Sequence, residues 1–335
     1  MWRRGLPAKQ IPERKIHKDS MEYVYIIAGF VLLLFGGDYL VKGASGLALK
    51  LDVSPMLVGI TVVALGTSAP ELVVSLSAAL KGKPDIAVGN VVGSNIANVA
   101  LILGFTALLF PIRIKRRTLR LDWIVLMAAS ILFIALGQNG LLNRWEGALS
   151  VGLMTAYISV SYVMERRSDD PQFGSDGVDT KEASRHIALL LFFIIAGSVA
   201  LVFGAQWLVE GAEILARSFG VSDRVIAITL VSFGTSVPEL AASIIAAFKG
   251  QKDLSLGNII GSNLYNLLAV LGITSLVKPI HIAPEIVNVD MWWMLATSFA
   301  ILPIGIIGMK IGRIGGILLF LAYVCYIALV LIPAS

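Results

Sequence analysis

Residues 66–104 read GTSAPELVVSLSAALKGKPDIAVGNVVGSNIANVALILG, and residues 234–272 read GTSVPELAASIIAAFKGQKDLSLGNIIGSNLYNLLAVLG. The two copies align without a gap from the first glycine to the last, and about half of the aligned positions are identical. Each copy holds one glutamate, Glu71 or Glu239, inside a long apolar run. A carboxylate in hydrocarbon costs at least ~2–3 kcal/mol, so an acid in such a run is a functional hypothesis by default. Two acids at matching positions therefore predict one duplicated site.

The composition indicates a polytopic membrane protein. Of 335 residues, 57% are hydrophobic and only 15% are charged, whereas soluble domains carry about 25% charged residues. A soluble enzyme is excluded on this ground. The single cysteine, Cys325, excludes a disulfide framework and a thiolate metal site. The net charge of +5 lies largely in short loops, where it indicates membrane topology and not nucleic-acid binding.

Ten apolar stretches approach the roughly 20 residues that span a bilayer. Backbone polar groups in lipid must be satisfied within their own segment, so these stretches are expected to be helices. We therefore predict an all-α polytopic membrane protein with ten transmembrane helices. The approximate bounds are 22–41, 55–80, 86–110, 121–138, 146–164, 187–209, 224–248, 255–277, 291–308 and 314–333.

The similarity between the halves extends upstream of the two copies. Residues 35–54 align with residues 203–222 at the same offset, so helices 1–3 match helices 6–8. Five helices in each half is an odd number, so the second half must enter the membrane from the opposite side. This predicts two inverted five-helix repeats, which place ion sites near the midplane. The predicted divisions are a polar basic tail at 1–20, a first repeat at 21–164, a linker at 165–186 and a second repeat at 187–335.

Lysine and arginine counts favour one orientation. With the N-terminus outside, the inner loops hold 15 basic residues and the outer loops hold six. Both termini are then outside a plasma or inner membrane, and the 165–186 linker is cytoplasmic. The tail at 1–20 adds six basic residues to the outside, which weakens this orientation unless the chain starts at Met21.

Three further charged features are interpreted as structural. The basic run at 113–117 is read as a topology signal in preference to an anionic-lipid contact. The linker aspartates lack the ligand spacing of an EF-hand, so a solvated hinge is preferred to a regulatory calcium site. Asp38 is matched by Gln206 in the second half, so it lies outside the duplicated chemistry.

Polar residues at helical spacing accompany each glutamate. Residues three or four apart share a helix face, so each glutamate lies in a polar stripe, and the next helix carries a second stripe. All these side chains offer oxygen, the ligand that hard cations such as Ca²⁺ prefer, and none is a soft ligand. The stripes are Thr67, Ser68, Glu71 and Ser75; Asn90, Ser94 and Asn98; Thr235, Ser236, Glu239 and Ser243; and Asn258, Ser262 and Asn266.

Proline and glycine add to this pattern. Pro70 and Pro238 cannot donate to the carbonyls four residues earlier, and freed carbonyls commonly bind ions in transporters. The small residues of the two copies are expected to allow close helix approach. They are Gly66, Gly93, Gly234 and Gly261.

Two simpler readings of these residues exist. Ser68 and Glu71 also fit a capping box, which starts many ordinary helices. The serines and asparagines of the second stripe could merely join helices by hydrogen bonds. Recurrence of both patterns at matching positions of the two copies favours an ion site.

Charge limits what such a site can hold. Two carboxylates are neutralised by one Ca²⁺, two Na⁺ or two protons, and an exchanger needs such mutually exclusive occupancies. An intramembrane hydrolase using Ser68 or Ser236 lacks a neighbouring base. An ion channel is disfavoured because paired carboxylates bind too tightly for fast conduction.

At these residues the sequence resembles the sodium/calcium exchanger branch of the calcium/cation antiporter superfamily. GTSAPE and GTSVPE, followed by GNVVGSN and GNIIGSN, are similar to that family's repeats, whereas proton/calcium exchangers usually carry GNxxE. The resemblance implies an antiporter, not an enzyme, that exchanges Na⁺ for Ca²⁺ by alternating access, exports Ca²⁺ and is electrogenic. Helices 2, 3, 7 and 8 would form its core, and helices 1 and 6 would slide. The alternative is a proton-coupled or other divalent-cation antiporter on the same fold.

The resemblance also implies roles for individual residues. Glu71 and Glu239 would ligate Ca²⁺, and Asn98 and Asn266 would face the central site. Potassium-dependent relatives carry aspartate at position 266, so asparagine argues against potassium co-transport. Backbone carbonyls for Ca²⁺ would come from Thr67 and Thr235; the Na⁺ sites would use Ser68, Ser94, Ser236 and Ser262 with the carbonyls of Ala64 and Ser232. The expected partners are the two ions and the bilayer, with no cofactor, nucleic acid or obligate protein partner.

Overall fold

The computed structural model describes residues 21–167, 185–220 and 232–331. Its first half is almost entirely helical. The elements are α1 (Met21–Leu51), α2 (Pro55–Val58), η1 (Gly59–Val63), α3 (Ala64–Thr67), α4 (Ala69–Leu80), α5 (Pro84–Ile96), η2 (Ala97–Leu103), α6 (Gly104–Leu109), β1 (Ile112–Arg113), α7 (Arg116–Arg120), α8 (Asp122–Gly137), β2 (Leu141–Leu142) and α9 (Arg144–Arg166).

The second half repeats this order. Here η1, η2, η4 and η5 are π-helical turns and η6 is a 3₁₀ turn. The elements are α11 (Ile187–Ser218), α13 (Ser232–Gly234), α14 (Val237–Phe248), α15 (Lys252–Leu264), η4 (Tyr265–Val270), α16 (Leu271–Val277), β3 (Ile280–His281), η5 (Ile286–Asp290), α17 (Met291–Ile306), η6 (Ile307–Met309), β4 (Lys310–Ile311) and α18 (Arg313–Leu331).

The number of spans agrees with the predicted fold class. Within the described ranges, eight helices are long and apolar enough to cross a membrane. A ninth span is the pair Pro55–Thr67 and Ala69–Leu80, which is bent by 46°. The helix expected at 224–248 is described only from Ser232 onward, as α13 and α14. An all-α polytopic membrane fold is confirmed, with a helix count consistent with ten.

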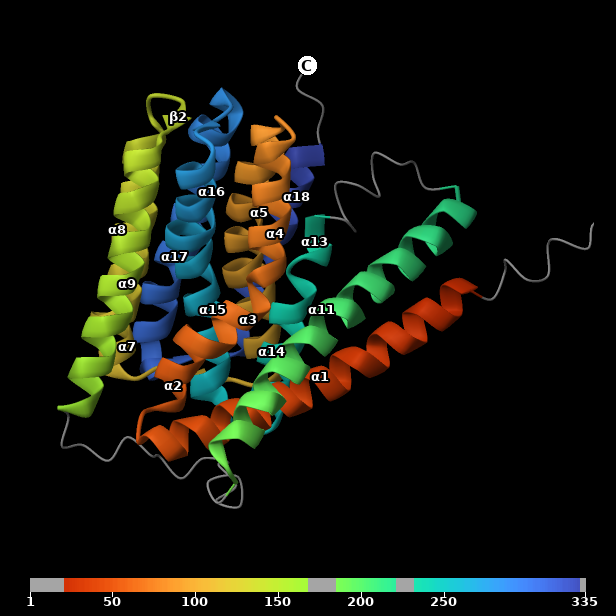
Figure 1. Cartoon of the computed structure of the whole chain (residues 1–335), viewed down its shortest axis with the longest axis vertical. Helices are drawn as coiled ribbons and strands as arrows, with labels where there is room; N and C mark the ends of the chain where they lie inside the picture. The colour runs from red at the N-terminus through yellow and green to blue at the C-terminus, as the bar shows by residue number, and fades with distance from the viewer. Residues whose placement is uncertain (1–20, 168–184, 221–231, 332–335) are drawn as a thin grey trace, which may run out of the picture.

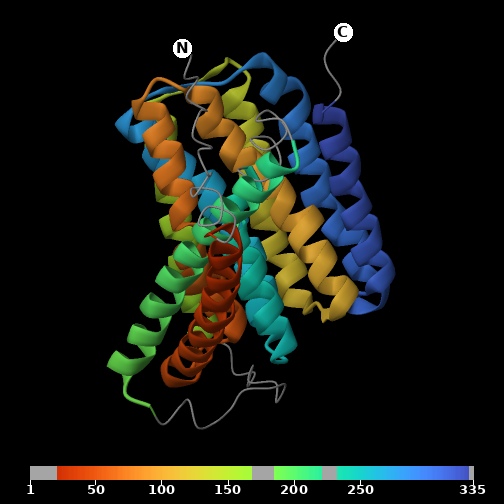
Figure 2. The same ribbon diagram turned by 90° about the vertical axis from the view of Figure 1, so that its right-hand side faces the viewer.

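Two helices are longer than the sequence predicted. α1 reaches Leu51 and α11 reaches Ser218, although their apolar runs were placed at 22–41 and 187–209. The segment 42–54, predicted as an inner loop, is therefore mostly helical. A 31-residue helix is about 46 Å long, longer than the ~30 Å hydrocarbon core, so it must tilt. Figures 1 and 2 show α1 and α11 side by side, leaning across the rest of the bundle.

Glycines bring α1 and α11 together. A Cβ atom on Gly36 would lie 2.8 Å from the backbone nitrogen of Leu201, and one on Gly197 would lie 2.5 Å from that of Leu40. Side chains at these positions would collide with backbone, so close packing requires glycine. The same holds for the other members of the series, which is Gly29, Gly36 and Gly43 on α1 and Gly197, Gly204 and Gly211 on α11.

The glycines singled out in the two copies behave differently from one another. Gly261 lies against the backbone of Ile60, where a Cβ would be only 2.6 Å away. Gly66 and Gly234 instead face side chains of α11. Gly93 has nothing within 4 Å of a Cβ position, so the prediction of close packing is wrong there.

Two short ribbons show how the halves are related. β1 pairs with β4, and β2 pairs with β3, both antiparallel. Each ribbon thus takes one strand from each half, and β1 and β3 are separated by the same offset as the two sequence copies. β1 and β2 flank the two ends of α7 and α8, so the ribbons lie at opposite ends of the bundle. Exchanging the halves converts one ribbon into the other, as inverted repeats require.

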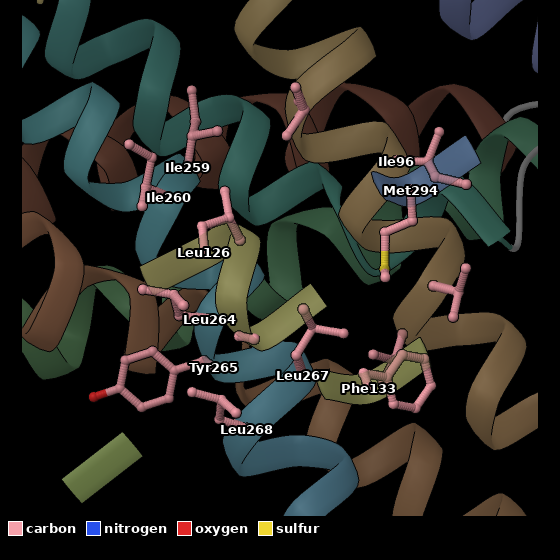
Figure 3. Close-up of a cluster of buried hydrophobic side chains, with 14 of the residues drawn as sticks. Ile96, Leu126, Phe133, Ile259, Ile260, Leu264, Tyr265, Leu267, Leu268 and Met294 are labelled. Carbon is pink, nitrogen blue, oxygen red and sulfur yellow. The ribbon is translucent and has the colours of Figure 1, made fainter. Parts of the chain in front are cut away.

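The core surrounds α5 and α15, which are the most buried of the apolar spans. Apolar side chains from α8 and α17 pack against them. Figure 3 shows part of this cluster, in which Leu126 and Phe133 of α8 and Met294 of α17 lie among Ile96, Ile259, Ile260, Leu264, Tyr265, Leu267 and Leu268. The two central helices are therefore shielded from lipid, and polar side chains on them must find partners inside the protein.

Several charged side chains pair at the ends of the helices. Arg117 donates to Glu165, whose other oxygen accepts from the backbone nitrogen of Ser54 at 2.8 Å. Lys115 pairs with Asp253 at 2.7 Å. Two residues of the basic run 113–117 are thus held by acids within the protein. The expectations for residues 1–20 and for the linker aspartates lie outside the described residues.

Candidate cation-binding site

A proline stands in the first turn of each helix that carries a glutamate. α3 ends at Thr67 and α4 starts at Ala69, with Pro70 in its first turn. Pro238 takes the same place in α14. Proline is tolerated there because a first-turn N–H has no helical partner. Each break puts a glutamate into the first turn of a new helix, where the helix dipole favours negative charge.

Both carboxylates are fully buried, and hydroxyl groups connect them across the two repeats. Ser68 Oγ donates to Glu239 Oε1 at 3.1 Å. Ser94 Oγ lies 3.5 Å from Glu71 Oε1 and accepts from Ser236 Oγ at 3.2 Å. The structure therefore places Glu71 and Glu239 in one shared site.

A second set of hydrogen bonds follows the two-fold relation closely. Thr67 Oγ1 donates to Asn258 Oδ1 at 3.1 Å, and Thr235 Oγ1 donates to Asn90 Oδ1 at 3.3 Å. Asn90 Nδ2 in turn donates to Ser75 Oγ at 3.0 Å. In the other repeat, Asn258 donates to Ser243 at 2.9 Å. These bonds join α4 to α5 and α14 to α15, so they support the site from both sides.

The capping-box reading is excluded by the serine side chains. Ser68 and Ser236 stand at the N-cap positions of α4 and α14, but neither side chain makes a capping hydrogen bond. Their hydroxyls reach across the repeat boundary instead, to Glu239 and Ser94. A real capping box does occur at Asn143, which bonds the first turn of α9. The sequence pattern alone did not distinguish the capping residue Asn143 from Ser68 and Ser236, which do not cap their helices.

Several buried polar atoms in the site have no hydrogen-bond partner among the described residues. They include one oxygen of each glutamate and the amide oxygens of the two central asparagines. Buried polar groups are normally paired, so such atoms call for an explanation such as a bound ion. Carboxylate and amide oxygens are ligands for hard cations. These atoms are Glu71 Oε2, Glu239 Oε2, Asn98 Oδ1, and Asn266 Oδ1 and Nδ2.

Most of the twelve predicted site residues are brought together. Ala64 is buried, and its carbonyl accepts from Ser68 N at 2.9 Å and from Thr67 Oγ1 at 3.4 Å. Ser232 begins α13, and its side chain is outside the described set. Asn98 and Asn266 lie buried in η2 and η4. Hydrogen bonds connect the other eight, which are Thr67, Ser68, Glu71, Ser94, Thr235, Ser236, Glu239 and Ser262.

Sequence reasoning missed Asn95 and Asn263. Both are buried, and each donates its side-chain amide to the backbone carbonyl of the other, at 3.3 and 3.4 Å. Their identity in the two GSN motifs was a usable signal. They were passed over because they fall outside the i, i+4, i+8 stripe. They lie two residues before η2 and η4, and π-helical turns occur frequently at functional sites.

The described ranges contain no group of three or more histidine, cysteine, aspartate or glutamate side chains that could hold a metal ion. The site relies instead on two carboxylates with many neutral oxygens around them. Such a site suits ions that are bound and released, and it stands inside a two-fold bundle of membrane-spanning helices. Fold and site together define a class, the membrane transporters of small cations.

The family within this class is given by sequence. The family model for the sodium/calcium exchanger protein matches residues 21–163 and 189–332. The chain therefore belongs to the sodium/calcium exchanger family, whose members are cation antiporters and not enzymes. The two matched segments lie on either side of the linker and leave the 1–20 tail unmatched.

Individual relatives match along nearly their whole length. CaxA of Alkalimonas amylolytica, which is provisionally named an antiporter, is 37% identical over 90% of this chain and 96% of its own. The sodium/calcium exchanger MaX1 of Methanosarcina acetivorans is 32% identical over 92% of this chain and 98% of its own. Among solved structures, the sodium-calcium exchanger NCX_Mj superposes with a TM-score of 0.79 at 31% identity, covering 92% of this chain and 99% of that chain.

Proposed function

We propose that this protein exchanges Na⁺ for Ca²⁺ across a cell membrane by alternating access. The observation that carries the proposal is the shared site, in which Ser68 of one repeat bonds Glu239 of the other and both glutamates are buried. In this proposal Ca²⁺ is bound by Glu71 and Glu239 with the carbonyls of Thr67 and Thr235. Na⁺ is bound by Ser68, Ser94, Ser236 and Ser262 with the carbonyls of Ala64 and Ser232, and Asn98 and Asn266 face the centre.

The charge of the site supports exchange in preference to one-way transport. Two carboxylates close together repel strongly in a low dielectric. A carrier with neither ion bound is therefore disfavoured, and each change of access proceeds with Ca²⁺ or Na⁺ in place. Both ions use the same oxygens, so they compete for one site. That competition couples the flow of one ion to the gradient of the other.

The relatives support the choice of ions. MaX1 is named a sodium/calcium exchanger, and NCX_Mj has been solved after soaks in Na⁺ with Ca²⁺ and in Na⁺ with Sr²⁺. Position 266 is asparagine here, which fits a site of lower negative charge and no potassium requirement. The proposed transport needs no cofactor, because the ions themselves are the substrates.

Direction and sidedness complete the proposal. We propose that Ca²⁺ is exported through a plasma or inner membrane, with both termini outside and the 165–186 linker in the cytoplasm. We further propose that more than two Na⁺ enter per Ca²⁺, so that each cycle moves net charge.

The test is a flux measurement on purified protein in liposomes. We expect ⁴⁵Ca²⁺ uptake when Na⁺ is loaded inside and removed outside, and no uptake driven by a pH gradient of equal size. A membrane potential set by K⁺ and valinomycin should change the rate if the exchange is electrogenic. Uptake driven by the pH gradient alone would overturn Na⁺ coupling in favour of a proton-coupled antiporter.

A further inference from the structure

The reciprocal pair Asn95 and Asn263 lies where the two repeats meet, beside the residues proposed to bind ions. Asn95 Nδ2 donates to the Asn263 carbonyl at 3.3 Å, and Asn263 Nδ2 donates to the Asn95 carbonyl at 3.4 Å. Both side chains are buried. Met294, which Figure 3 shows beside Ile96, takes a weaker contact from Asn95 Nδ2 at 3.7 Å. None of these contacts involves a glutamate, so the pair has no place in the site as proposed.

A chain of hydrogen bonds leads from this pair to Asn98. A backbone carbonyl only accepts, so the Asn95 carbonyl requires the nitrogen of the Asn263 amide on its side. Asn263 is then left with Oδ1, which accepts from Asn98 Nδ2 at 3.0 Å. Asn98 is left in turn with Oδ1, which is buried and has no partner among the described residues. The orientation of both amides therefore follows from the Asn95 carbonyl, which can only accept a hydrogen bond.

The contact between Asn98 and Asn263 has no counterpart between Asn266 and Asn95, the residues at the corresponding positions of the other repeat. The members of that counterpart would be Asn95 Oδ1 and Asn266 Nδ2, and neither atom has a partner within the described ranges. Asn266 Oδ1 is equally without a partner there. The side chain of Asn263 therefore fixes Asn98, whereas the side chain of Asn95 fixes nothing in the central site. The Asn95 side chain reaches only the Asn263 carbonyl and Met294, and it is the Asn95 backbone carbonyl that orients the Asn263 amide.

We propose that Asn263 is a positioning residue for cation binding, which holds the Asn98 amide with its oxygen toward the ion. The inference rests on the proposed function. Without the Asn263 acceptor the Asn98 amide can turn over, and its NH₂ group then faces the cation. Groups that orient metal ligands from behind typically change metal affinity by roughly 10- to 100-fold when removed. We expect a loss of that size in Ca²⁺ affinity for Asn263→Ala.

The positioning role is tested by measuring the Ca²⁺ affinity of the detergent-purified protein by calorimetric titration. The matched control is Asn95→Ala, which removes the same side chain at the same depth but keeps the carbonyl that orients Asn263. We expect the control to shift the Ca²⁺ dissociation constant by about threefold or less. Equal losses in the two variants would show a general packing role and overturn the proposal. Asn263→Leu, which keeps the volume, replaces alanine if that variant does not fold.

A double-mutant cycle separates orientation from structure. Asn98→Asp puts two equivalent oxygens at the site, so turning the side chain over no longer matters. The new carboxylate has no N–H for Asn263 Oδ1, so Asn263→Ala should then leave Ca²⁺ affinity unchanged or raise it, and the two changes should be strongly non-additive. An undiminished loss in the Asn98→Asp background would refute the positioning role. Absence of Ca²⁺ binding by the unmodified protein would instead refute the proposed function itself.

Discussion

The first half carries Asp38 on α1 where the second half carries Gln206 on α11, although both halves keep a lysine after the glutamate-bearing helix, Lys81 and Lys249. Asp38 pairs with Lys249 of the other half and with Lys42, at 2.7 Å, on its own helix. Gln206 has no charge to offer Lys81. Around the glutamates, by contrast, the halves carry the same hydroxyl and amide residues, and several of their contacts are repeated, such as Thr67 to Asn258 and Thr235 to Asn90.

This difference matters because of what inverted repeats do. In alternating access by such repeats, the inward-open and outward-open states arise when the two halves exchange conformations. Identical halves would give the two states equal free energy. Only residues that differ between the halves, or that make contacts on one side alone, can favour one state. In the proposed mechanism, the matched residues are therefore expected to bind the ions, and the unmatched ones to bias the direction in which the site faces.

The largest expected effect comes from the matched glutamates. Glu71→Gln and Glu239→Gln each remove one of two charges from the buried site, and one carboxylate cannot neutralise Ca²⁺. We expect each variant to fold and to lose Ca²⁺ exchange in proteoliposomes, with the same result in both because the halves correspond. Asp85→Asn, which changes an exposed acid in the first half, is the control. Retained exchange in either glutamine variant would contradict a shared site.

The sequence allowed the fold class to be predicted, together with most of the residues that the structure brings together at the candidate site. A gapless repeat with a buried acid in each copy gave the duplicated site, and hydropathy gave the spans. The sequence did not predict the full lengths of α1 and α11. Lys42 and Glu210 lie inside these helices, and a hydropathy profile interprets charged residues as loops. The glycines that join α1 to α11 were also overlooked, since their partners are distant in sequence.

The site shows a similar limit. Serine hydroxyls that fit a local capping pattern turned out to bond across the repeat boundary, as Ser68 does to Glu239. A stripe rule found Asn98 but not Asn263, because the contact between them joins different helices. Helical spacing identifies residues on one face of one helix. It does not show which faces of different helices pack together, and the contacts of Ser68 with Glu239 and of Asn98 with Asn263 depend on that packing.

A smaller effect is expected where the α1–α11 pair is held by glycine. A Cβ on Gly36 would lie 2.8 Å from the Leu201 nitrogen, and one on its repeat mate Gly204 would lie 2.9 Å from the Gly29 oxygen. Overpacking of this kind typically costs about 1–3 kcal/mol. We expect Gly36→Ala and Gly204→Ala to lower the thermal stability of the purified protein by similar amounts.

Gly152→Ala on α9 is the matched control for these variants. A Cβ there meets nothing within 4 Å, and alanine favours helix over glycine by about 1 kcal/mol. The control should therefore be neutral or slightly stabilising. A large difference between Gly36→Ala and Gly204→Ala would mean that the two halves do not share this contact equally.

The smallest effect, and the one that addresses direction, is expected at Asp38. Partly exposed ion pairs contribute up to about 1 kcal/mol, so Asp38→Asn should change the balance of inward-open and outward-open states by up to roughly fivefold. We expect the ratio of apparent Ca²⁺ affinities on the two faces of oriented vesicles to move by that factor. Gln206→Asp would give Lys81 a carboxylate in the exchanged state, where the two occupy the places of Asp38 and Lys249, and it should therefore move the ratio in the same direction. Shifts of opposite sign in the two variants would show that this ion pair does not set the preferred state, and the bias would then have to come from other unmatched positions, such as Ser232 opposite Ala64.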